Sequence, residues 1–399
     1  MVSSAGEVLA DTGRVDMGEE LQRTPLYEEH LALGARMVAF AGFEMPIQYS
    51  GIVEEHRAVR SSAGVFDISH MATFRVFGFG ARDFLQSLLT NDLDRISELA
   101  SAQYTLLCDE DGGIIDDLIV YHSGDLEYLI IANAANRVTD FDWLEKHCPE
   151  GLKVVGADER AVPADGLVEL VDESDRTALI ALQGPAALDV YAELAGDGAS
   201  APIPARFHIA EARVGSVPVL VARTGYTGED GVELICHSSH AVALWRAILS
   251  FSEVVPVGLG ARDTLRLEMG YHLYGSDIDR GVDPVSAGLD WVVGKEKGDF
   301  VGREAIERIR ERGPSRRLVG LVVDEGIARP GYPVLHEGRE VGKVASGTFS
   351  PIRSAGIATA YIPIQLAAPG TRLEVAIRRK VVPATVERTP FVTSTSLSS

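Results

Sequence analysis

Residues 112–121 read Gly-Gly-Ile-Ile-Asp-Asp-Leu-Ile-Val-Tyr, so two adjacent carboxylates interrupt an apolar, β-branched run. This composition predicts a strand, in which successive side chains point to opposite faces. We expect Asp116 on one face with Ile114, and Asp117 on the other face with Ile115. Burying an unpaired carboxylate costs roughly several kcal/mol, so at least one of the two aspartates needs a specific partner. The stretch is therefore expected at the centre of a functional site.

The same run predicts the first strand of a β-hairpin. The chain is expected to turn at residues 123–125 and to return as a second strand over residues 126–132, which ends at Asn133. Asn133 then lies level with the aspartate pair. At this position an asparagine either binds a ligand or serves as an ordinary turn residue, and the sequence leaves both alternatives open.

A glycine-rich segment is the second candidate for a binding loop. Residues 224–231 read Thr-Gly-Tyr-Thr-Gly-Glu-Asp-Gly and lie between two strand-like runs, residues 219–223 and 232–235. Such a loop can bring backbone and the ring of Tyr226 close to a flat ligand, although an elaborate hairpin turn would have the same composition. Glu233 interrupts the second run in the same way as Asp117 interrupts the first, and is a second candidate site residue.

Two further motifs have weaker implications. Residues 78–83 and 258–263 share the pattern Gly-x-Gly-Ala-Arg-Asp after a strand-like run, but an aspartate replaces the third glycine of a dinucleotide fingerprint. A Rossmann site is therefore not expected, and the repetition is either an internal duplication or a coincidence. His70, which follows Ser69, is either a general base or a hydrogen-bonded structural residue.

Composition excludes several classes of function. The chain has 399 residues, which is typical of about two or three domains, and its formal net charge of -21 argues against nucleic-acid binding. Its three cysteines are far apart and have no metal-ligand spacing, so we expect reduced thiols and no metal. No stretch approaches the ~20 apolar residues of a membrane span. These features predict a soluble, cytoplasmic protein without membrane contact.

The chain divides into segments of different character. Residues 1–23 are expected to be a disordered extension, and residues 24–298 an α+β region. Residues 299–313 predict a connecting helix that begins near Phe300 and is capped by Asp299. Short strands separated by glycine and proline predict a small all-β domain, a sandwich or barrel, over residues 314–392. Residues 393–399 are expected to be a flexible tail.

Taken together, these segments resemble the aminomethyltransferase, or T-protein, family of the glycine cleavage system. The resemblance extends from Thr24 to about Val392 and rests on many motifs in the same order. The matching segments are residues 24–27, 41–46, 66–71, 112–118, 223–231, 260–263 and 273–275.

The resemblance implies a fold, a reaction and partners. The fold has three domains around a central hole that holds tetrahydrofolate, with two interleaved α+β domains followed by a C-terminal β-rich domain. The reaction takes an aminomethyl group from the lipoyl arm of the H-protein, transfers its one-carbon unit to tetrahydrofolate as co-substrate, and releases ammonia. Besides the lipoylated H-protein, the P- and L-proteins of the same system are implied as indirect partners.

The resemblance also implies roles for individual residues. Asp117 maps to the catalytic carboxylate, Glu233 to the glutamate that contacts the pterin, and Arg262 to the arginine of the Gly-x-Gly-Ala-Arg-Asp segment, which leaves Asp116 a structural role. Five further residues are implied as lining of the folate pocket: Met71, Tyr104, Asn133, Tyr226 and Tyr271. Ala72 departs from the family pattern, which commonly has glycine there, and suggests a slightly different pocket wall.

Related functions use the same folate-binding architecture. One alternative is a folate-dependent demethylase of a sulfonium or methylamine substrate, and another is a non-catalytic folate-binding factor for iron-sulfur maturation. That factor carries a cysteine-containing loop, whereas residues 223–226 contain no cysteine. Because the H-protein should be acidic around its lipoyl lysine, two basic stretches are candidate docking sites: the pair at residues 316–317 and the triplet at residues 378–380.

Overall fold

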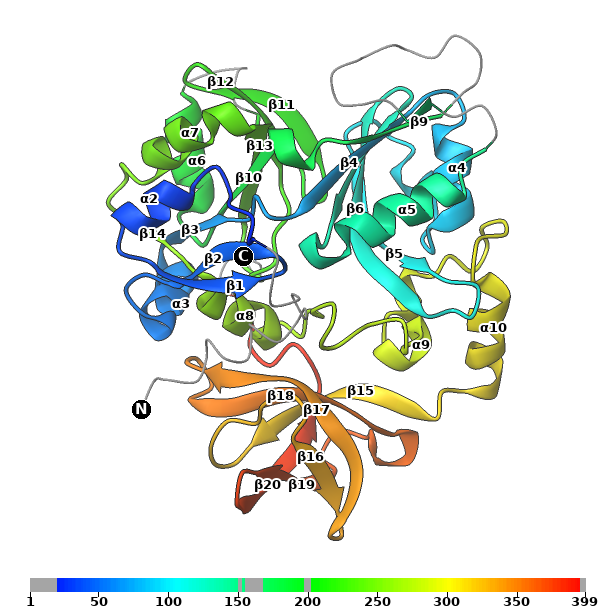
Figure 1. The fold of residues 1–399 in the computed structure, drawn as a ribbon. Helices are drawn as coiled ribbons and strands as arrows, with labels where there is room; N and C mark the ends of the chain where they lie inside the picture. Colours follow the sequence, from blue (N-terminus) through cyan, green and yellow to red (C-terminus); the bar gives the residue numbers. More distant parts are fainter. Residues whose placement is uncertain (1–19, 150–152, 155–167, 197–201, 395–399) are drawn as a thin grey trace.

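The computed structural model describes residues 20–149, 153–154, 168–196 and 202–394 (Figure 1). The predicted N-terminal extension lies outside these ranges except for residues 20–23, and the predicted tail is described only to residue 394. Gln22 forms backbone hydrogen bonds with Gly42 and Glu44, so the ordered chain begins before Thr24. Within the described ranges, no helix combines the length and the apolar character that spanning a membrane requires.

Two six-stranded sheets form the larger part of the molecule. The first contains, in spatial order, β11 (Ile209–Val214), β12 (Val217–Ala222), β13 (Gly231–His237), β10 (Thr177–Gln183), β3 (Ala63–Asp67) and β14 (Val254–Pro256). The second contains β5 (Ala102–Cys108), β6 (Ile114–Gly124), β7 (Glu127–Ala132), β4 (Ala72–Phe77), β9 (Glu169–Asp172) and β8 (Lys153–Val154). The chain thus begins the first sheet at β3, leaves it to build the second, and returns at β10.

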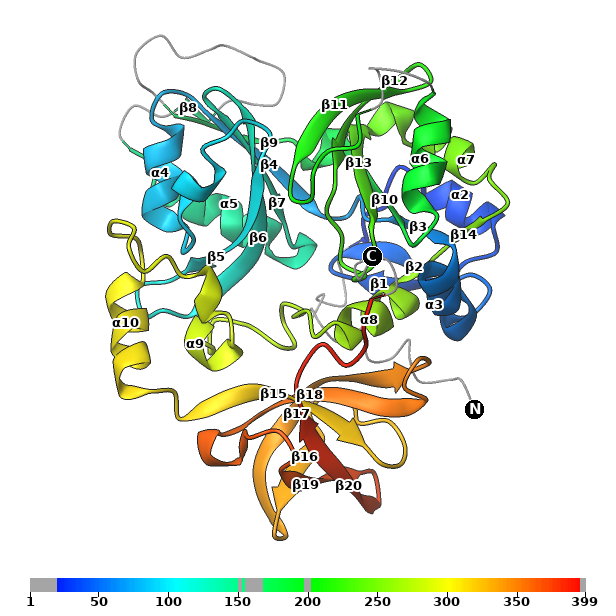
Figure 2. The same ribbon diagram turned by 180° about the vertical axis from the view of Figure 1, so that it is seen from behind.

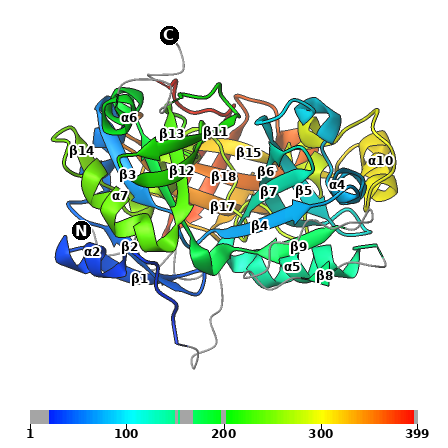
Figure 3. The same ribbon diagram turned by 90° about the horizontal axis from the view of Figure 1, so that it is seen from above.

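The two sheets face each other across an apolar contact. Helices α6 (Ala187–Ala195) and α7 (Ala241–Ile248) cover the outer face of the first sheet, and α4 (Ala81–Leu88) and α5 (Arg137–Lys146) cover the outer face of the second. On the inner faces, Phe66 of the first sheet belongs to one core cluster with Tyr121 and Leu129 of the second. Figure 3 shows the sheets side by side above the C-terminal strands. Their inner faces are therefore where side chains from both sheets can meet.

The predicted hairpin forms, with one local correction. From Asp116 onward the side chains of β6 alternate as predicted. Leu118 points into the apolar core between this sheet and helices α4 and α5, whereas Ile119 points to the inner face. The alternation predicted for Ile114 and Ile115 is wrong. Asp116 and Ile114 pair with consecutive residues of β5, so Ile115 is an extra residue and joins the same core as Leu118. A β-bulge of this kind shifts the faces of the residues before it.

The connecting helix also differs from the prediction. Helix α10 (Arg303–Arg312) begins at Arg303 rather than near Phe300, and Asp299 does not cap it. The residue before the helix is Gly302, with a φ of +87°, a left-handed conformation that glycine adopts without strain. Asp299 instead accepts a hydrogen bond from the backbone N–H of Phe300, at 3.0 Å. Ile306 of α10 then packs in one cluster with Ile114, which attaches the connecting segment to the start of β6.

The C-terminal strands close into a barrel, which decides between the two predicted all-β architectures. In order around the barrel the strands are β15 (Arg316–Val323), β18 (Ala355–Pro363), β17 (Arg339–Ser350), β16 (Pro333–His336), β19 (Arg372–Ile377) and β20 (Lys380–Glu387). Closure removes the unpaired strand edges that an open sheet of this size would expose. The barrel encloses its own apolar core, which includes Leu321, Val334 and Val375.

The remaining elements link these parts. They are α2 (Tyr27–Ala32), β1 (Arg36–Phe40), β2 (Phe43–Gln48), α3 (Ile52–Ser61), α8 (Leu259–Glu268) and α9 (Pro284–Ala287). Helix α8 packs against β2, α3 and the barrel strand β17. Figure 2 shows α8 and the chain that follows it between the barrel and the two sheets. Because α8 contacts the barrel as well as α3 and β2, its side chains can join separate parts of the chain.

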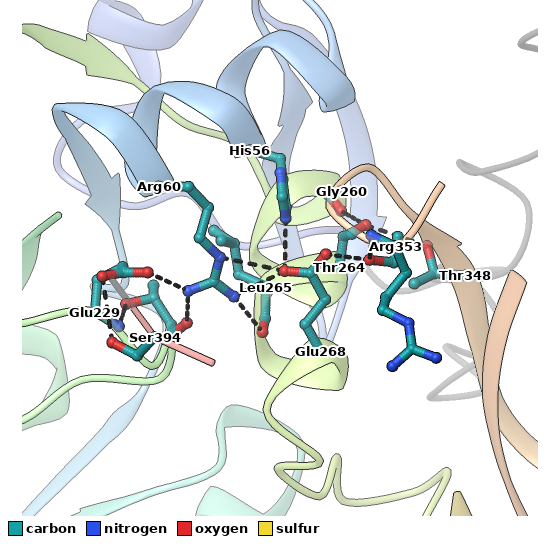
Figure 4. Close-up of polar contacts among 12 residues, drawn as sticks. His56, Arg60, Glu229, Gly260, Thr264, Leu265, Glu268, Thr348, Arg353 and Ser394 are labelled. Atoms are coloured by element: carbon teal, nitrogen blue, oxygen red, sulfur yellow. Dashed lines mark hydrogen bonds and ion pairs between the residues drawn. The ribbon is translucent and has the colours of Figure 1, made fainter. Parts of the chain in front are cut away.

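Glu268, at the end of α8, is the centre of a buried polar joint (Figure 4). Its side chain is 0% exposed, and its Oε2 accepts hydrogen bonds from His56 Nε2 and from a terminal nitrogen of Arg60, both at 2.8 Å. Its Oε1 accepts from the hydroxyl of Ser350 on β17. Arg60 also forms an ion pair with Glu229, at 2.8 Å. The joint therefore connects α3, α8, the glycine-rich loop and the barrel.

The ionised form of Glu268 is favoured in the folded protein. Burial opposes ionisation, but hydrogen bonds from His56 and Ser350 and the charge of Arg60 outweigh it and hold the pKa of Glu268 below its usual value. A carboxyl group whose pKa is lower in the folded than in the unfolded chain stabilises the fold above its unfolded pKa, and this contribution is lost as the pH falls.

We predict that Glu268→Gln lowers the free energy of unfolding at pH 7 by about 3 kcal/mol, because Arg60 remains buried and loses the ionic partner Glu268. Urea unfolding measures this value. The matched control is Glu387→Gln, which removes the partly exposed ion pair of Arg353 and should cost less than about 1 kcal/mol. The difference between wild type and Glu268→Gln should shrink as the pH falls below about 4. Equal effects of the two substitutions would contradict the assignment of the joint.

Candidate active site

A cavity of about 550 Å³ opens between the inner faces of the two sheets. Its walls come from β6 and β7 of the second sheet, from β13 and the glycine-rich loop of the first, and from α8 and the chain that follows it. All eight site residues predicted from the sequence line this one cavity: Met71, Tyr104, Asp117, Asn133, Tyr226, Glu233, Arg262 and Tyr271. Elements distant in sequence therefore converge on one site.

Asp117 projects from β6 into the cavity and is held at both carboxyl oxygens. Tyr104 donates its hydroxyl to Oδ2 at 3.0 Å, and the side-chain amide of Asn133 donates to Oδ1 at 2.8 Å. Burial, followed by the nearby charge of Asp116, raises the pKa of Asp117 to about 7. A carboxyl group with this pKa can both accept and donate a proton near neutral pH.

Asp116 lies behind Asp117, away from the cavity, and is fully buried. Its carboxyl oxygens accept from the backbone N–H of Asn133 at 3.0 Å, from the Asn133 side chain at 2.8 Å and from the Asn136 side chain at 2.7 Å. These bonds tie the end of β7 and the start of α5 to β6. The side-chain nitrogen of Asn133 therefore bridges the two aspartates, which is more than a turn residue requires, and its contact with a ligand stays a prediction.

Glu233 faces the cavity from the opposite sheet. Thr224 donates its hydroxyl to Glu233 Oε2 at 2.5 Å, and the Thr224 hydroxyl also lies 3.0 Å from that of Tyr121. Burial raises the pKa of Glu233, while Thr224 and the charge of Arg262 act in the opposite direction. One carboxyl oxygen is thus held by the protein, and the carboxylate is oriented towards the cavity.

A cation and two tyrosines form another wall. The guanidinium carbon of Arg262, on α8, lies 4.9 Å from the ring centroid of Tyr226, a distance at which a cation is attracted to an aromatic face. The rings of Tyr226 and Tyr271 stack with centroids 5.8 Å apart. The Tyr226 hydroxyl donates to the backbone carbonyl of His272. These contacts fix a flat aromatic surface beside a positive charge.

The glycine-rich loop connects the antiparallel strands β12 and β13 and packs closely against the end of α8, while its contact with a ligand stays a prediction. Arg223 and Asp230 form an ion pair at 2.6 Å that closes its base. Gly228 has a φ of +79°, and a Cβ at this position would lie 2.3 Å from Cγ of Met269. A larger residue would therefore both strain the backbone and push the loop away from α8.

Some cavity residues escaped the sequence reasoning. Trp291 is 64% exposed, lies at the edge of the cavity and stacks on Tyr104 with ring centroids 5.9 Å apart. His272 also lines the cavity, and its Nε2 donates a hydrogen bond to the carbonyl oxygen of Ala287, 2.9 Å away. The only sequence feature that could have indicated Trp291 is that a tryptophan stands in a stretch rich in turn residues. Nothing in the sequence around His272 marked it.

His70 and Ala72 can now be placed. His70 lines the cavity, and burial lowers its pKa to about 4, so its imidazole is neutral at pH 7. Its buried Nδ1 has no hydrogen-bond partner among the described residues, which does not support the hydrogen-bonded structural role. Ala72 is buried in the core below the helices and does not line the cavity, so the expected change in the pocket wall is wrong.

The arrangement suits a flat polar ligand with an electrophilic or cationic reaction centre. Glu233 offers a carboxylate edge that can accept two hydrogen bonds, and the tyrosines offer faces for stacking. Asp117 provides negative charge where positive charge would develop. In the described part of the chain, no group of three His, Cys, Asp or Glu side chains is arranged to hold a metal ion.

Comparisons with known proteins agree with this geometry. The family profile for the GCVT N-terminal domain matches residues 26–297, and the profile for the glycine cleavage T-protein C-terminal barrel domain matches residues 316–393. An aminomethyltransferase of Symbiobacterium thermophilum is 45% identical over 386 residues, which cover 95% of this chain and 99% of that protein. An aminomethyltransferase of Geobacillus thermodenitrificans is 46% identical over 376 residues, which cover 93% and 98%.

A solved structure supports the same conclusion about the fold. The glycine cleavage system aminomethyltransferase T from Bartonella henselae is 34% identical, with a TM-score of 0.84 over 94% of this chain and 99% of that one. The predicted α+β T-protein-like fold with a C-terminal β-domain is confirmed. The sequence therefore belongs to the glycine cleavage T-protein family, and this protein is an aminomethyltransferase of that family.

Proposed function

We propose that the cavity binds tetrahydrofolate as co-substrate and that the protein transfers to it the one-carbon unit of an aminomethyl group carried on the lipoyl arm of an H-protein. The products are methylenetetrahydrofolate, ammonia and the dihydrolipoyl arm. The observation that carries the proposal is the convergence of Asp117, Glu233 and Arg262, from two sheets and a helix, on one cavity lined with tyrosines.

Each residue has a role that follows from its chemistry. Glu233 pairs with the amide-and-amino edge of the pterin through two hydrogen bonds. Tyr226 and Tyr271 cover a face of the ring system, and Arg262 meets a carboxylate of the folate tail or orients an acidic group. Met71 completes the apolar part of the pocket.

Asp117 is the proposed catalytic residue. Close to the nucleophilic nitrogens of the folate, its carboxylate aligns them and stabilises the cationic, iminium-like carbon as the C–S bond breaks and the sulfur leaves with the bonding electrons on the dihydrolipoyl arm. With a pKa of about 7 it also accepts and returns a proton during the transfer. Tyr104 and Asn133 hold the carboxylate in one orientation for these tasks.

The alternative functions are not favoured by the comparisons, since curated relatives at about 45% identity are aminomethyltransferases. Two assays distinguish an aminomethyltransferase from these alternatives. We expect folate-dependent ammonia release from aminomethylated H-protein, and no methyl transfer from a sulfonium or methylamine compound. Activity in the second assay alone would replace our proposal by a demethylase, and folate binding without either activity would favour the iron-sulfur maturation factor.

The carrier protein is proposed to dock where the cavity meets a second hollow. Trp291 lines both, and the second hollow also contains the exposed side chain of Arg317. The triplet at residues 378–380 lies at the β19–β20 turn, and Lys380 is paired with Glu325. Of the two basic stretches predicted from the sequence, we therefore propose the first as the docking site.

We also propose the domain division expected from the sequence, with the α+β region at residues 24–298, the connecting segment at residues 299–313 and the β-domain at residues 314–392. A cytoplasmic location is likewise proposed. Its support is that the three cysteines are unpaired and that the relatives named above are bacterial.

We predict that Asp117→Asn lowers kcat about a hundredfold or more while folate binding is retained, because the amide keeps the size of the carboxylate but has neither its charge nor its basicity. Ammonia release from aminomethylated H-protein and equilibrium folate binding measure the two quantities. Asp125→Asn, at the exposed turn of the same hairpin, is the matched control and should leave kcat unchanged. Near-normal turnover of Asp117→Asn would refute the catalytic assignment.

We predict that Glu233→Gln raises the Kd for tetrahydrofolate about tenfold to a hundredfold, since a charged acceptor of two hydrogen bonds is replaced by a neutral amide. Fluorescence or calorimetric titration of the purified protein provides the measurement. Glu211→Gln on the exposed side of β11 should bind folate as tightly as the wild type. If both variants bind with the wild-type Kd, the pterin edge does not contact Glu233.

We predict that Arg317→Glu raises the KM for H-protein about threefold to tenfold without a change in folate Kd, because charge at the rim of an interface mainly affects association. The effect should weaken as the salt concentration rises. Arg379→Glu, an equally exposed reversal at the far β19–β20 turn, is the control and should leave this KM unchanged. If Arg379→Glu raises the KM for H-protein and Arg317→Glu does not, the docking site lies at the β19–β20 turn instead.

A further inference from the structure

A third carboxyl group lies behind the two aspartates of β6. Asp140, in the first turn of α5, is 0% exposed, and neither of its carboxyl oxygens has a hydrogen-bond donor among the described N–H and hydroxyl groups. Its side chain is within hydrogen-bonding reach of the carboxyl group of Asp116. Two carboxylates cannot hydrogen-bond to each other, so this contact requires a proton on one of them.

The surroundings decide which aspartate holds that proton. The two oxygens of Asp116 accept three N–H hydrogen bonds from Asn133 and Asn136, at distances between 2.7 and 3.0 Å, and such bonds favour the ionised form. Asp140 receives none of these bonds. Burial and the charges of Asp116 and Asp117 together raise the pKa of Asp140 well above its usual range. Asp140 is therefore the acid of the pair.

We propose that Asp140 is a positioning residue, a buried carboxylic acid that donates its O–H to Asp116 and thereby keeps one negative charge on Asp116 directly behind Asp117. The bridging amide of Asn133 then transmits a fixed geometry to both carboxylates of β6. This inference rests on the proposed role of Asp117, and it explains why one fully buried acid stands in α5 without any other partner in the described structure.

The proposal has a consequence for the pH dependence of the reaction. A negative charge kept on Asp116 disfavours ionisation of Asp117, so its removal should lower the pKa of Asp117. Other groups around the three carboxyls act on the same equilibrium. Tyr104, His272 and Asn133 favour the ionised form of Asp117, the exposed Arg280 favours ionisation of Asp140, and Tyr274 and Asp279 lie near Arg280. None of these groups changes in the variants proposed below.

The test is a pH titration of protein labelled with carbon-13 at the aspartate carboxyl groups, together with a pH profile of kcat/KM. In Asp140→Asn the amide still donates to Asp116 and no charge changes. We therefore expect the titration midpoint of Asp117 to stay within about 0.3 units of the wild type, while one aspartate that remains protonated above this midpoint disappears from the spectrum. In the double variant Asp116→Asn with Asp140→Asn, the midpoint should fall by about one unit or more.

The acid limb of kcat/KM should follow the Asp117 midpoint in each variant, and the loss of the protonated aspartate in Asp140→Asn is the readout that a purely structural role of Asp140 would not produce. Asp142→Asn, on the exposed side of the same helix, is the matched control and should change neither the number of aspartates that stay protonated above the Asp117 midpoint nor the midpoint itself. If the double variant does not fold, the loss of the protonated aspartate in Asp140→Asn still tests the proposal.

Two results would overturn the inference. A midpoint that falls in Asp140→Asn as far as in the double variant would place the charge on Asp140, and an unchanged number of protonated aspartates in Asp140→Asn would show that Asp140 is ionised. The titration needs no substrate, so it is independent of the proposed function. If Asp117→Asn proves fully active while Asp140 is protonated, only the catalytic assignment fails.

Discussion

The cost of removing carboxylates from water is the constraint on which this structure depends. Asp116 and Asp117 lie in a strand whose neighbours are apolar, and each would be destabilising without compensation. Asn133 compensates both at once, because it directly follows the next strand and its backbone and side-chain nitrogens reach the two carboxyl groups. The hairpin that places Asn133 there is thus a structural requirement of the site as much as of the sheet.

Helix α8 combines the site with the assembly of the molecule. Arg262 reaches the cavity, Arg266 binds Asp277 at 2.6 Å and Ser346 of the barrel at 2.8 Å, and Glu268 forms the buried joint with α3. A displacement of α8 would therefore disturb the cavity, the contacts of Arg266 with Asp277 and Ser346, and the buried joint around Glu268 at the same time. This arrangement gives a physical reason for the high polarity of a helix that is largely buried: its charged side chains bind partners in neighbouring parts of the chain, in addition to the apolar contacts that Leu265 and Leu267 make.

Local patterns were sufficient for much of this description. The β-branched run of residues 112–121 predicted a hairpin, Glu233 was suspected because it interrupts an apolar strand, and the order of motifs predicted the family. Other features were not accessible in this way. The bulge at Ile115 depends on the register with β5, and the start of α10 depends on the left-handed backbone of Gly302. Trp291 became a candidate only because folding stacks it on Tyr104.

The sequence by itself identified the candidate residues for the chemistry, since carboxylates in apolar strands and glycines at fixed spacing are visible in the chain. It also determined the α+β architecture and the β-rich C-terminal domain. Only the tertiary structure decided that the two sheets face each other and enclose one cavity, and that Asp140 stands behind Asp116. The physical reason is that burial, and hence the pKa of each carboxyl group, arises from contacts between segments far apart in sequence, which local composition does not encode.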